Sequence, residues 1–173
     1  MPGKRKDHTV PTYTQPNANM DASHLRVAMA VSTYHSDITT AMREGAEKFF
    51  KDCNGQSHHL AVIECPGAWE LPGAIAAMCD ALDPPADACL ALGCVIQGET
   101  SHDQWINASV SDALMAISVN AGVPVSFGLL TCENLAQAKA RSGGDRGNKG
   151  AEAMAAAIAQ ALANEDIQWG TEQ

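Results

Sequence analysis

A short segment near the middle of this 173-residue chain combines an anion site with a group that can transfer protons. The uncharged stretch at residues 90–96 is typical of a strand buried on both faces. A turn at Gly98 follows, and a helical pattern opens at Thr100 or Ser101. The first N–H groups of a helix have no partner within it and, together with the helix dipole, favour an anion. His102 lies within one turn of this point, so the segment predicts a phosphate site with a titratable side chain beside it.

Two earlier segments carry aromatic and acidic side chains at the ends of predicted strands. Tyr34 follows the first strand, where its ring suits stacking on a flat heterocycle and equally suits an ordinary rim or core position. Trp69 and Glu70 follow the second strand, after Gly67, which permits a tight turn. Glu70 offers an acceptor to hydroxyl or amine groups. Taken by itself, however, it is more simply a first-turn glutamate that complements the helix dipole.

Two basic residues flank a glycine-rich loop near the C-terminus. Arg141 precedes the loop at residues 142–148, and Lys149 follows it. The planar guanidinium of arginine matches the geometry of phosphate, and lysine supplies a point charge. Both are also ordinary charges for helix ends, and Phe127 on the preceding apolar run is an ordinary core residue when taken alone. The loop by itself therefore leaves both interpretations open.

The elements that must position these residues alternate along the chain from residue 25. Strand patterns cover residues 25–31, 59–64, 88–96 and 123–130, and helical patterns cover residues 36–51, 69–82, 101–120, 133–140 and 149–164. Strands separated by helices predict a parallel sheet with helices on both faces. Because ligands bind at the carboxyl ends of the strands in such sheets, we expect the loops described above to meet there.

Composition and length set the broad class of the protein. We expect one domain at residues 24–166, a mobile N-terminal arm at 1–23 and a C-terminal tail at 167–173. The net charge of −9 argues against a nucleic-acid partner. The sequence has neither a membrane-length apolar run nor a signal-peptide core, which predicts no membrane association and a cytoplasmic location. The six cysteines form no CxxC pair, so neither a disulfide framework nor a metal site is expected.

Five motifs, in order along the chain, resemble the lumazine synthase family, whose members make 6,7-dimethyl-8-ribityllumazine, the precursor of riboflavin. They lie at residues 66–72, 91–96, 98–102, 122–128 and 147–150. The resemblance implies a flavodoxin-like three-layer α/β/α sandwich with a four-stranded parallel sheet. It also implies a transferase that condenses 5-amino-6-(D-ribitylamino)uracil with 3,4-dihydroxy-2-butanone 4-phosphate and releases phosphate and water, without a metal or cofactor.

The resemblance further implies roles for particular residues. The pyrimidine and its ribityl chain are expected to contact Tyr34, Ala68, Trp69, Glu70, Cys94, Val95 and Ile96. The butanone phosphate is expected at the turn formed by Gly98, Glu99 and Thr100. The expected catalytic residues are His102, Arg141 and Lys149, with His102 moving protons and Arg141 binding the phosphate. Phe127, Arg141 and Lys149 match residues that the family supplies from a neighbouring subunit.

A site shared between chains implies an obligate homo-oligomer, which the family forms as a pentamer or as an icosahedral shell of pentamers. Riboflavin synthase is a further candidate partner. The sequence departs from the family pattern at Gln97, where Arg is usual, and at His35, where Asn is common. Around His102, the residues Ser101, Asp103 and Gln104 replace a proline, an aromatic and an acidic residue. These departures leave two alternatives open: a diverged member that binds flavin or lumazine without turnover, and a shell protein that encloses another protein.

Overall fold

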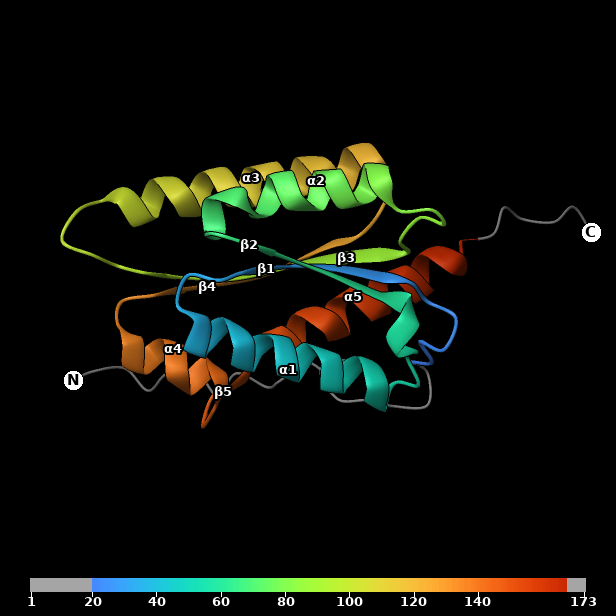
Figure 1. Ribbon diagram of the computed structural model, residues 1–173, viewed down its shortest axis with the longest axis horizontal. Helices are drawn as coiled ribbons and strands as arrows, with labels where there is room; N and C mark the ends of the chain where they lie inside the picture. Colours follow the sequence, from blue (N-terminus) through green and yellow to red (C-terminus); the bar gives the residue numbers. More distant parts are fainter. Residues whose placement is uncertain (1–19, 168–173) are drawn as a thin grey trace, which may run out of the picture.

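Four parallel strands form the central sheet of the protein, in the order β2-β1-β3-β4. The computed structural model describes residues 20–167. The strands are β1 (Val27–Ser32), β2 (Leu60–Cys65), β3 (Ala88–Ile96) and β4 (Val125–Cys132). Helices α2 (Leu71–Ala81) and α3 (His102–Ala121) cover one face, and α1 (Ser36–Asp52), α4 (Leu135–Arg141) and α5 (Lys149–Glu165) cover the other (Figure 1). The predicted α/β sandwich with a four-stranded parallel sheet is confirmed.

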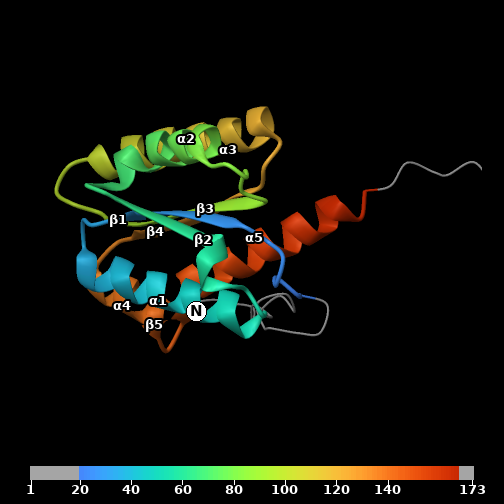
Figure 2. The same cartoon turned by 45° about the vertical axis from the view of Figure 1, so that its right-hand side comes forward.

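The two central strands, β1 and β3, supply the middle of the core. All six residues of β1 are buried, and their side chains alternate between the two helical layers. Met29 and Leu90 pack toward α1 and α5, whereas the smaller Ala28 and Ala91 pack toward α2 and α3. Figure 2 shows the twisted sheet between these layers. Burial on both faces explains why β1 and β3 read as continuous apolar runs rather than as alternating patterns.

Local chemistry moves several element boundaries away from the predicted ones. The helix predicted at 69–82 begins instead with a 3₁₀ turn, Ala68–Glu70, and α2 starts at Leu71. Pro72 lacks an N–H group and therefore belongs in the first turn of an α-helix. Strand β4 starts at Val125 rather than at residue 123, because the Ser118 hydroxyl donates to Val123 O and accepts from Val125 N at the turn before it.

The glycine-rich segment before α5 is a small hairpin rather than an open loop. Strand β5 (Ser142–Gly144) pairs antiparallel with β6 (Gly147–Asn148). The Arg146 N–H donates to Ala140 O at 2.9 Å and holds the tip of this hairpin against the end of α4. Arg141 and Lys149 therefore lie at the two ends of one ordered hairpin.

The ends of the described chain differ from each other. Most of the arm predicted at 1–23 lies outside the described residues, but residues 20–23 lie against the domain. Met20 and Ala22 are buried, and the Ala22 N–H donates to Cys53 O at 2.7 Å. Of the tail predicted at 167–173, the described part is Ile167, which is exposed. Within residues 20–167, no helix has the length and apolar character needed to cross a membrane.

Candidate functional site

A cavity of about 610 Å³ lies at the carboxyl ends of three strands. The loops after β1 and β2, the end of β3 and the first turns of α3 all contribute to it. Its lining consists of Tyr34, His35, Gly67, Ala68, Trp69, Cys94, Val95, Ile96, Gly98, Thr100, His102, Asp103 and Ile106. The sequence pattern predicted that these four segments meet, and the structure brings their residues together. Glu70 and Glu99 are exposed beside the cavity and are not part of its lining.

The corner after β1 is held in an unusual backbone conformation. His35 is left-handed, with φ 58° and ψ 52°, and its carbonyl accepts from Ile38 N and Thr39 N at the start of α1. The Tyr34 N–H donates to Ser32 Oγ at 3.2 Å. The rings of Tyr34 and His35 meet edge to face with centroids 4.6 Å apart. Tyr34 is 66% exposed, so its ring offers a free face at the cavity mouth.

The corner after β2 provides a second aromatic face. Trp69 is 59% exposed and lies in the 3₁₀ turn that leads into α2, while Ala68 is buried. A Cβ atom on Gly67 would lie 3.1 Å from Glu70 Oε2, so the Glu70 carboxylate is folded back over the glycine turn. This carboxylate also raises the pKa of the Cys65 thiol, after the larger effect of burial. Glu70 therefore places its acceptor atoms next to Gly67, at the edge of the cavity.

The end of β3 presents backbone and apolar side chains rather than a nucleophile. Cys94 and Val95 are buried, and burial raises the pKa of the Cys94 thiol to about 12, with Cys132 and Asp37 adding to the shift. The Cys94 thiol therefore stays neutral near pH 7 and does not act as a thiolate. Its contribution to the cavity is packing and the peptide groups of the strand.

The start of α3 gives the cavity its polar corner. Ser101 is the N-cap of α3, and its side chain makes no capping hydrogen bond. The first N–H groups of the helix are thus not satisfied by the cap side chain. His102 is the first residue of α3 and is exposed. A Cβ atom on Gly98 would meet nothing within 4 Å, which leaves open space at the turn.

A second, smaller cavity of about 270 Å³ carries the basic residues. It is lined by Phe127, Leu129, Leu130, Thr131, Arg141, Arg146, Lys149 and Glu152. The Lys149 Nζ atom lies 3.6 Å from Glu152 Oε2. Phe127 is 39% exposed on β4, which pairs with β3 along one edge. The hairpin formed by β5 and β6 lies between Arg141 and Lys149 and therefore fixes where these two basic residues begin and end the segment.

The structure does not bring all the predicted site residues into one cavity. Among the described residues, none lines both the cavity of about 610 Å³ and the cavity of about 270 Å³. Phe127 pairs with Ala91 in the β3–β4 register, five residues before Ile96, which is a separation of about 16 Å along the strand. Lysine and arginine are absent from the lining of the larger cavity, whereas the smaller one has three such residues.

Several lining residues were not predicted as site residues. The larger cavity adds His35, Gly67, Asp103 and Ile106, and the smaller one adds Leu129, Leu130, Thr131, Arg146 and Glu152. Asp103 Oδ1 is buried without a hydrogen-bond partner among the described residues, which leaves an acceptor for a ligand donor beside His102. Arg146 had a signal in the sequence, because it is a third basic residue within the glycine-rich segment between Arg141 and Lys149.

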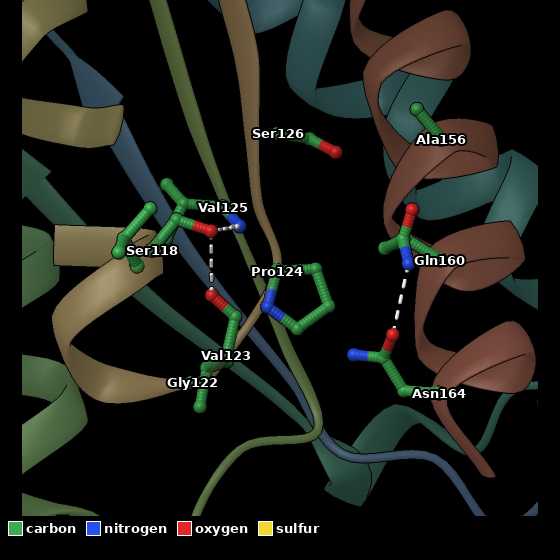
Figure 3. A pocket seen from close by; sticks show the side chains of 10 residues that line it. Ser118, Gly122, Val123, Pro124, Val125, Ser126, Ala156, Gln160 and Asn164 are labelled. Carbon is green, nitrogen blue, oxygen red and sulfur yellow. Dashed lines mark hydrogen bonds between the residues drawn. The ribbon is translucent and has the colours of Figure 1, made fainter. Parts of the chain in front are cut away.

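A third cavity, of about 510 Å³, lies at the other end of the sheet, between the end of α3 and α5 (Figure 3). Its lining includes Ser118, Pro124, Gln160 and Asn164 and contains no titratable side chain. Gln160 Nε2 donates to Asn164 Oδ1 at 2.8 Å along one wall. With no acid, base or charge, this cavity offers no group for proton or phosphate chemistry.

Comparison with known proteins shows the family to which the chain belongs. A family model described as 6,7-dimethyl-8-ribityllumazine synthase matches residues 24–165. The 6,7-dimethyl-8-ribityllumazine synthase of Rhodopirellula baltica is 44% identical over 133 residues, which cover 77% of this chain and 84% of the relative. The enzyme of that name from Leifsonia xyli subsp. xyli is 39% identical, and the match covers 83% of this chain and 89% of the relative. The one from Chlorobaculum tepidum is 38% identical, and the match covers 83% of this chain and 91% of the relative. The chain therefore belongs to the 6,7-dimethyl-8-ribityllumazine synthase family, a family of transferases in riboflavin biosynthesis.

Proposed function

We propose that this protein condenses 5-amino-6-(D-ribitylamino)uracil with 3,4-dihydroxy-2-butanone 4-phosphate to form 6,7-dimethyl-8-ribityllumazine, phosphate and water. One observation carries the proposal. Tyr34, Trp69, the end of β3, the Gly98 turn and His102 line a single cavity of about 610 Å³ at the carboxyl ends of the strands. Family membership agrees, because it implies small-molecule substrates and an oligomeric assembly.

The pyrimidine substrate is flat and rich in hydrogen-bonding groups, and the lining suits both properties. The exposed rings of Tyr34 and Trp69 offer stacking faces. The peptide groups at Cys94–Ile96 offer donors and acceptors to the edge of the ring, and the Glu70 carboxylate beside Gly67 is an acceptor for the ribityl hydroxyls. We assign the turn at Gly98, Glu99 and Thr100, with the N-terminus of α3, to the butanone phosphate.

The reaction needs orientation and proton transfer. The 5-amino group attacks the ketone to form an imine and releases water. Elimination of phosphate then leaves an enol that becomes a carbonyl on the neighbouring carbon, and the ribitylamino nitrogen attacks this carbonyl to close the ring with loss of a second water. Holding two substrates in register supplies roughly 7–11 kcal/mol in favourable cases. We assign the proton transfers of imine formation and elimination to His102, since general acid–base catalysis typically contributes about 10²–10⁴-fold.

The charge of the phosphate explains why we propose a shared site. The larger cavity has no lysine or arginine in its lining, and Asp103 adds a carboxylate there. Arg141, Arg146 and Lys149 of a neighbouring copy would supply the missing cations, together with Phe127. We therefore propose a homo-oligomer with sites between adjacent chains, either a pentamer or an icosahedral shell of pentamers, located in the cytoplasm, with riboflavin synthase as a candidate partner.

The test is to mix the purified protein with the two substrates and follow the absorbance and fluorescence of lumazine. A protein-free control is essential because the condensation also proceeds slowly without a catalyst. We expect product formation well above this control. A folded, assembled protein that gives no acceleration but binds riboflavin would indicate a flavin-binding protein, and particles that retain another protein would indicate a shell with a structural role.

A further inference from the structure

The side chain of Asn148 joins three segments of the chain, which are α1, β5 and the start of α5. Its Oδ1 atom accepts from the N–H groups of Gly150 at 2.9 Å and Ala151 at 3.1 Å, and thereby caps α5. Its Nδ2 atom donates to Ala41 O in α1 at 2.8 Å and to Ser142 O in β5 at 3.4 Å. Two donors face one end of the amide and two acceptors face the other, so these partners fix its orientation.

A simple helix cap would need only the Oδ1 contacts. The two Nδ2 contacts lie outside α5: Ala41 is 107 residues away in the sequence, and Ser142 is at the start of the hairpin. Asn134 provides the comparison within the same chain. It caps α4 by accepting from Gln137 N at 3.0 Å, and the structure records no donor contact from its side chain among the described residues.

Two glycines make room for this arrangement. A Cβ atom on Gly45 would overlap the Asn148 amide, and a Cβ atom on Gly150 would overlap Met42 O. Because both positions lack a side chain, the first turn of α5 lies directly against α1, with the half-buried amide between them. A side chain at Gly45 would displace the Asn148 amide from this position.

The position of Asn148 relates it directly to the two basic residues of the site. Arg141 precedes Ser142, whose carbonyl the amide holds, and Lys149 follows Asn148 as the first residue of α5. Both cations line the cavity of about 270 Å³. Asn148 is one end of the hairpin, and its amide is hydrogen-bonded to Ser142 at the other end and to Ala41 in the neighbouring helix, so the separation of the two cations depends on this residue.

We propose that Asn148 is a positioning residue for phosphate binding: it fixes the ends of the hairpin to α1 and so sets the spacing of Arg141 and Lys149. This inference rests on the proposed function, in which these cations hold the phosphate of the substrate. Asn148 does not touch the substrate in this scheme. It acts through the two residues beside it.

The test compares Asn148→Ser with Asn134→Ser in the assembled protein. Serine keeps a neutral oxygen that can cap a helix but is too short to reach Ala41 O. For Asn148→Ser we expect the KM for the butanone phosphate and the inhibition constant of inorganic phosphate to rise about tenfold, as for a weakened charge-assisted contact. The KM for the pyrimidine should change by less than about twofold, and Asn134→Ser should leave all three constants within that range.

A lower melting temperature with unchanged constants would overturn the proposal, because it would mean that the amide serves stability alone. An equal rise in both KM values would overturn it as well. If the wild-type protein forms no product above the spontaneous rate, the proposed function fails, and ³¹P NMR titration with inorganic phosphate then tests Asn148 separately. Weaker phosphate binding by Asn148→Ser supports the positioning role, and unchanged binding overturns it.

If Asn148→Ser does not fold, hydrogen exchange in Asn148→Asp provides the readout. Aspartate has nearly the same shape and keeps the cap, but it cannot donate to Ala41 O or Ser142 O. We expect faster exchange in peptides that span residues 141–149, relative to Asn134→Asp. Unchanged exchange there would contradict the proposal, whatever the effect of the added charge on phosphate binding.

Discussion

Phe127 lies opposite Ala91 in the register of β3 and β4, midway along the strands and away from the ends that carry the larger cavity. The cavity that contains Phe127 also contains Arg141 and Lys149, and it shares no lining residue with the cavity at His102 within residues 20–167. The two cavities therefore lie on different parts of one described chain, and the proposed function makes each of them a half-site. In the proposed function, each complete site combines the larger cavity of one copy with the basic cavity of another.

A subunit-mixing experiment tests this arrangement. Arg141→Ala damages the basic half-site and leaves the larger cavity intact, whereas Trp69→Ala does the reverse. In oligomers assembled from equal amounts of the two variants, about a quarter of the sites combine two undamaged halves. We expect each variant alone to have little activity and the mixture to recover up to about a quarter of the wild-type rate. A mixture no more active than the mean of the two variants would mean that each site lies within one chain.

The role of His102 is tested by His102→Ala. Because orientation of the substrates remains, we expect kcat to fall by about 10²-fold, the lower end for acid–base catalysis, with small changes in KM. His58→Ala is the matched control, since His58 is exposed near the other end of the sheet. The rate of lumazine formation, followed at several substrate concentrations, gives kcat and KM for both variants. An unchanged kcat would remove His102 from the mechanism, and complete loss would give it a larger role than proton transfer.

The sequence predicted the sheet and the larger cavity well because both depend on local patterns. Buried strands read as apolar runs, and the carboxyl ends of parallel strands meet by topology. Ala88–Ile96 was predicted to the residue. The starts of α2 and β4 were less accurate, since Pro72 and the Ser118 hydroxyl decide them through contacts that hydrophobic periodicity does not contain.

The contributions of Asp103 and Asn148 could not be predicted from the sequence, because they depend on contacts between distant segments. The buried Asp103 Oδ1 atom depends on how α3 meets the ends of β3 and β4, and the Asn148 contact with Ala41 joins segments 107 residues apart. Neither follows from local spacing. Arg146 is intermediate: it was not predicted as a site residue, although a third basic residue in the glycine-rich segment was a visible signal, and the structure shows that it lines the cavity with Arg141.

The left-handed conformation of His35 predicts an unequal response to substitution. Asparagine and glycine adopt this region readily, whereas a β-branched residue is strained there. We expect His35→Asn to leave the free energy of unfolding within about 0.5 kcal/mol and His35→Val to lower it by about 1–2 kcal/mol. Urea unfolding measures both, with Lys51→Val at an exposed helical position as the control. Equal stability of the Asn and Val variants would show that the corner relaxes to another conformation.

The buried thiols predict how stability depends on pH. Burial raises the pKa of Cys94 and of Cys89, each to about 12, from an ordinary value of 9.0. The unfolded chain therefore loses these protons first as the pH rises, and the stabilising difference present below pH 9 is lost progressively between pH 9 and 12. We expect the free energy of unfolding to fall across this range and to fall less steeply in Cys94→Ala. The comparison of slopes is independent of the cavity that alanine creates, because that cost does not change with pH. Urea midpoints taken at several pH values measure the slopes, and identical slopes for the variant and the wild type would mean that the Cys94 thiol ionises as readily in the folded protein as in the unfolded chain.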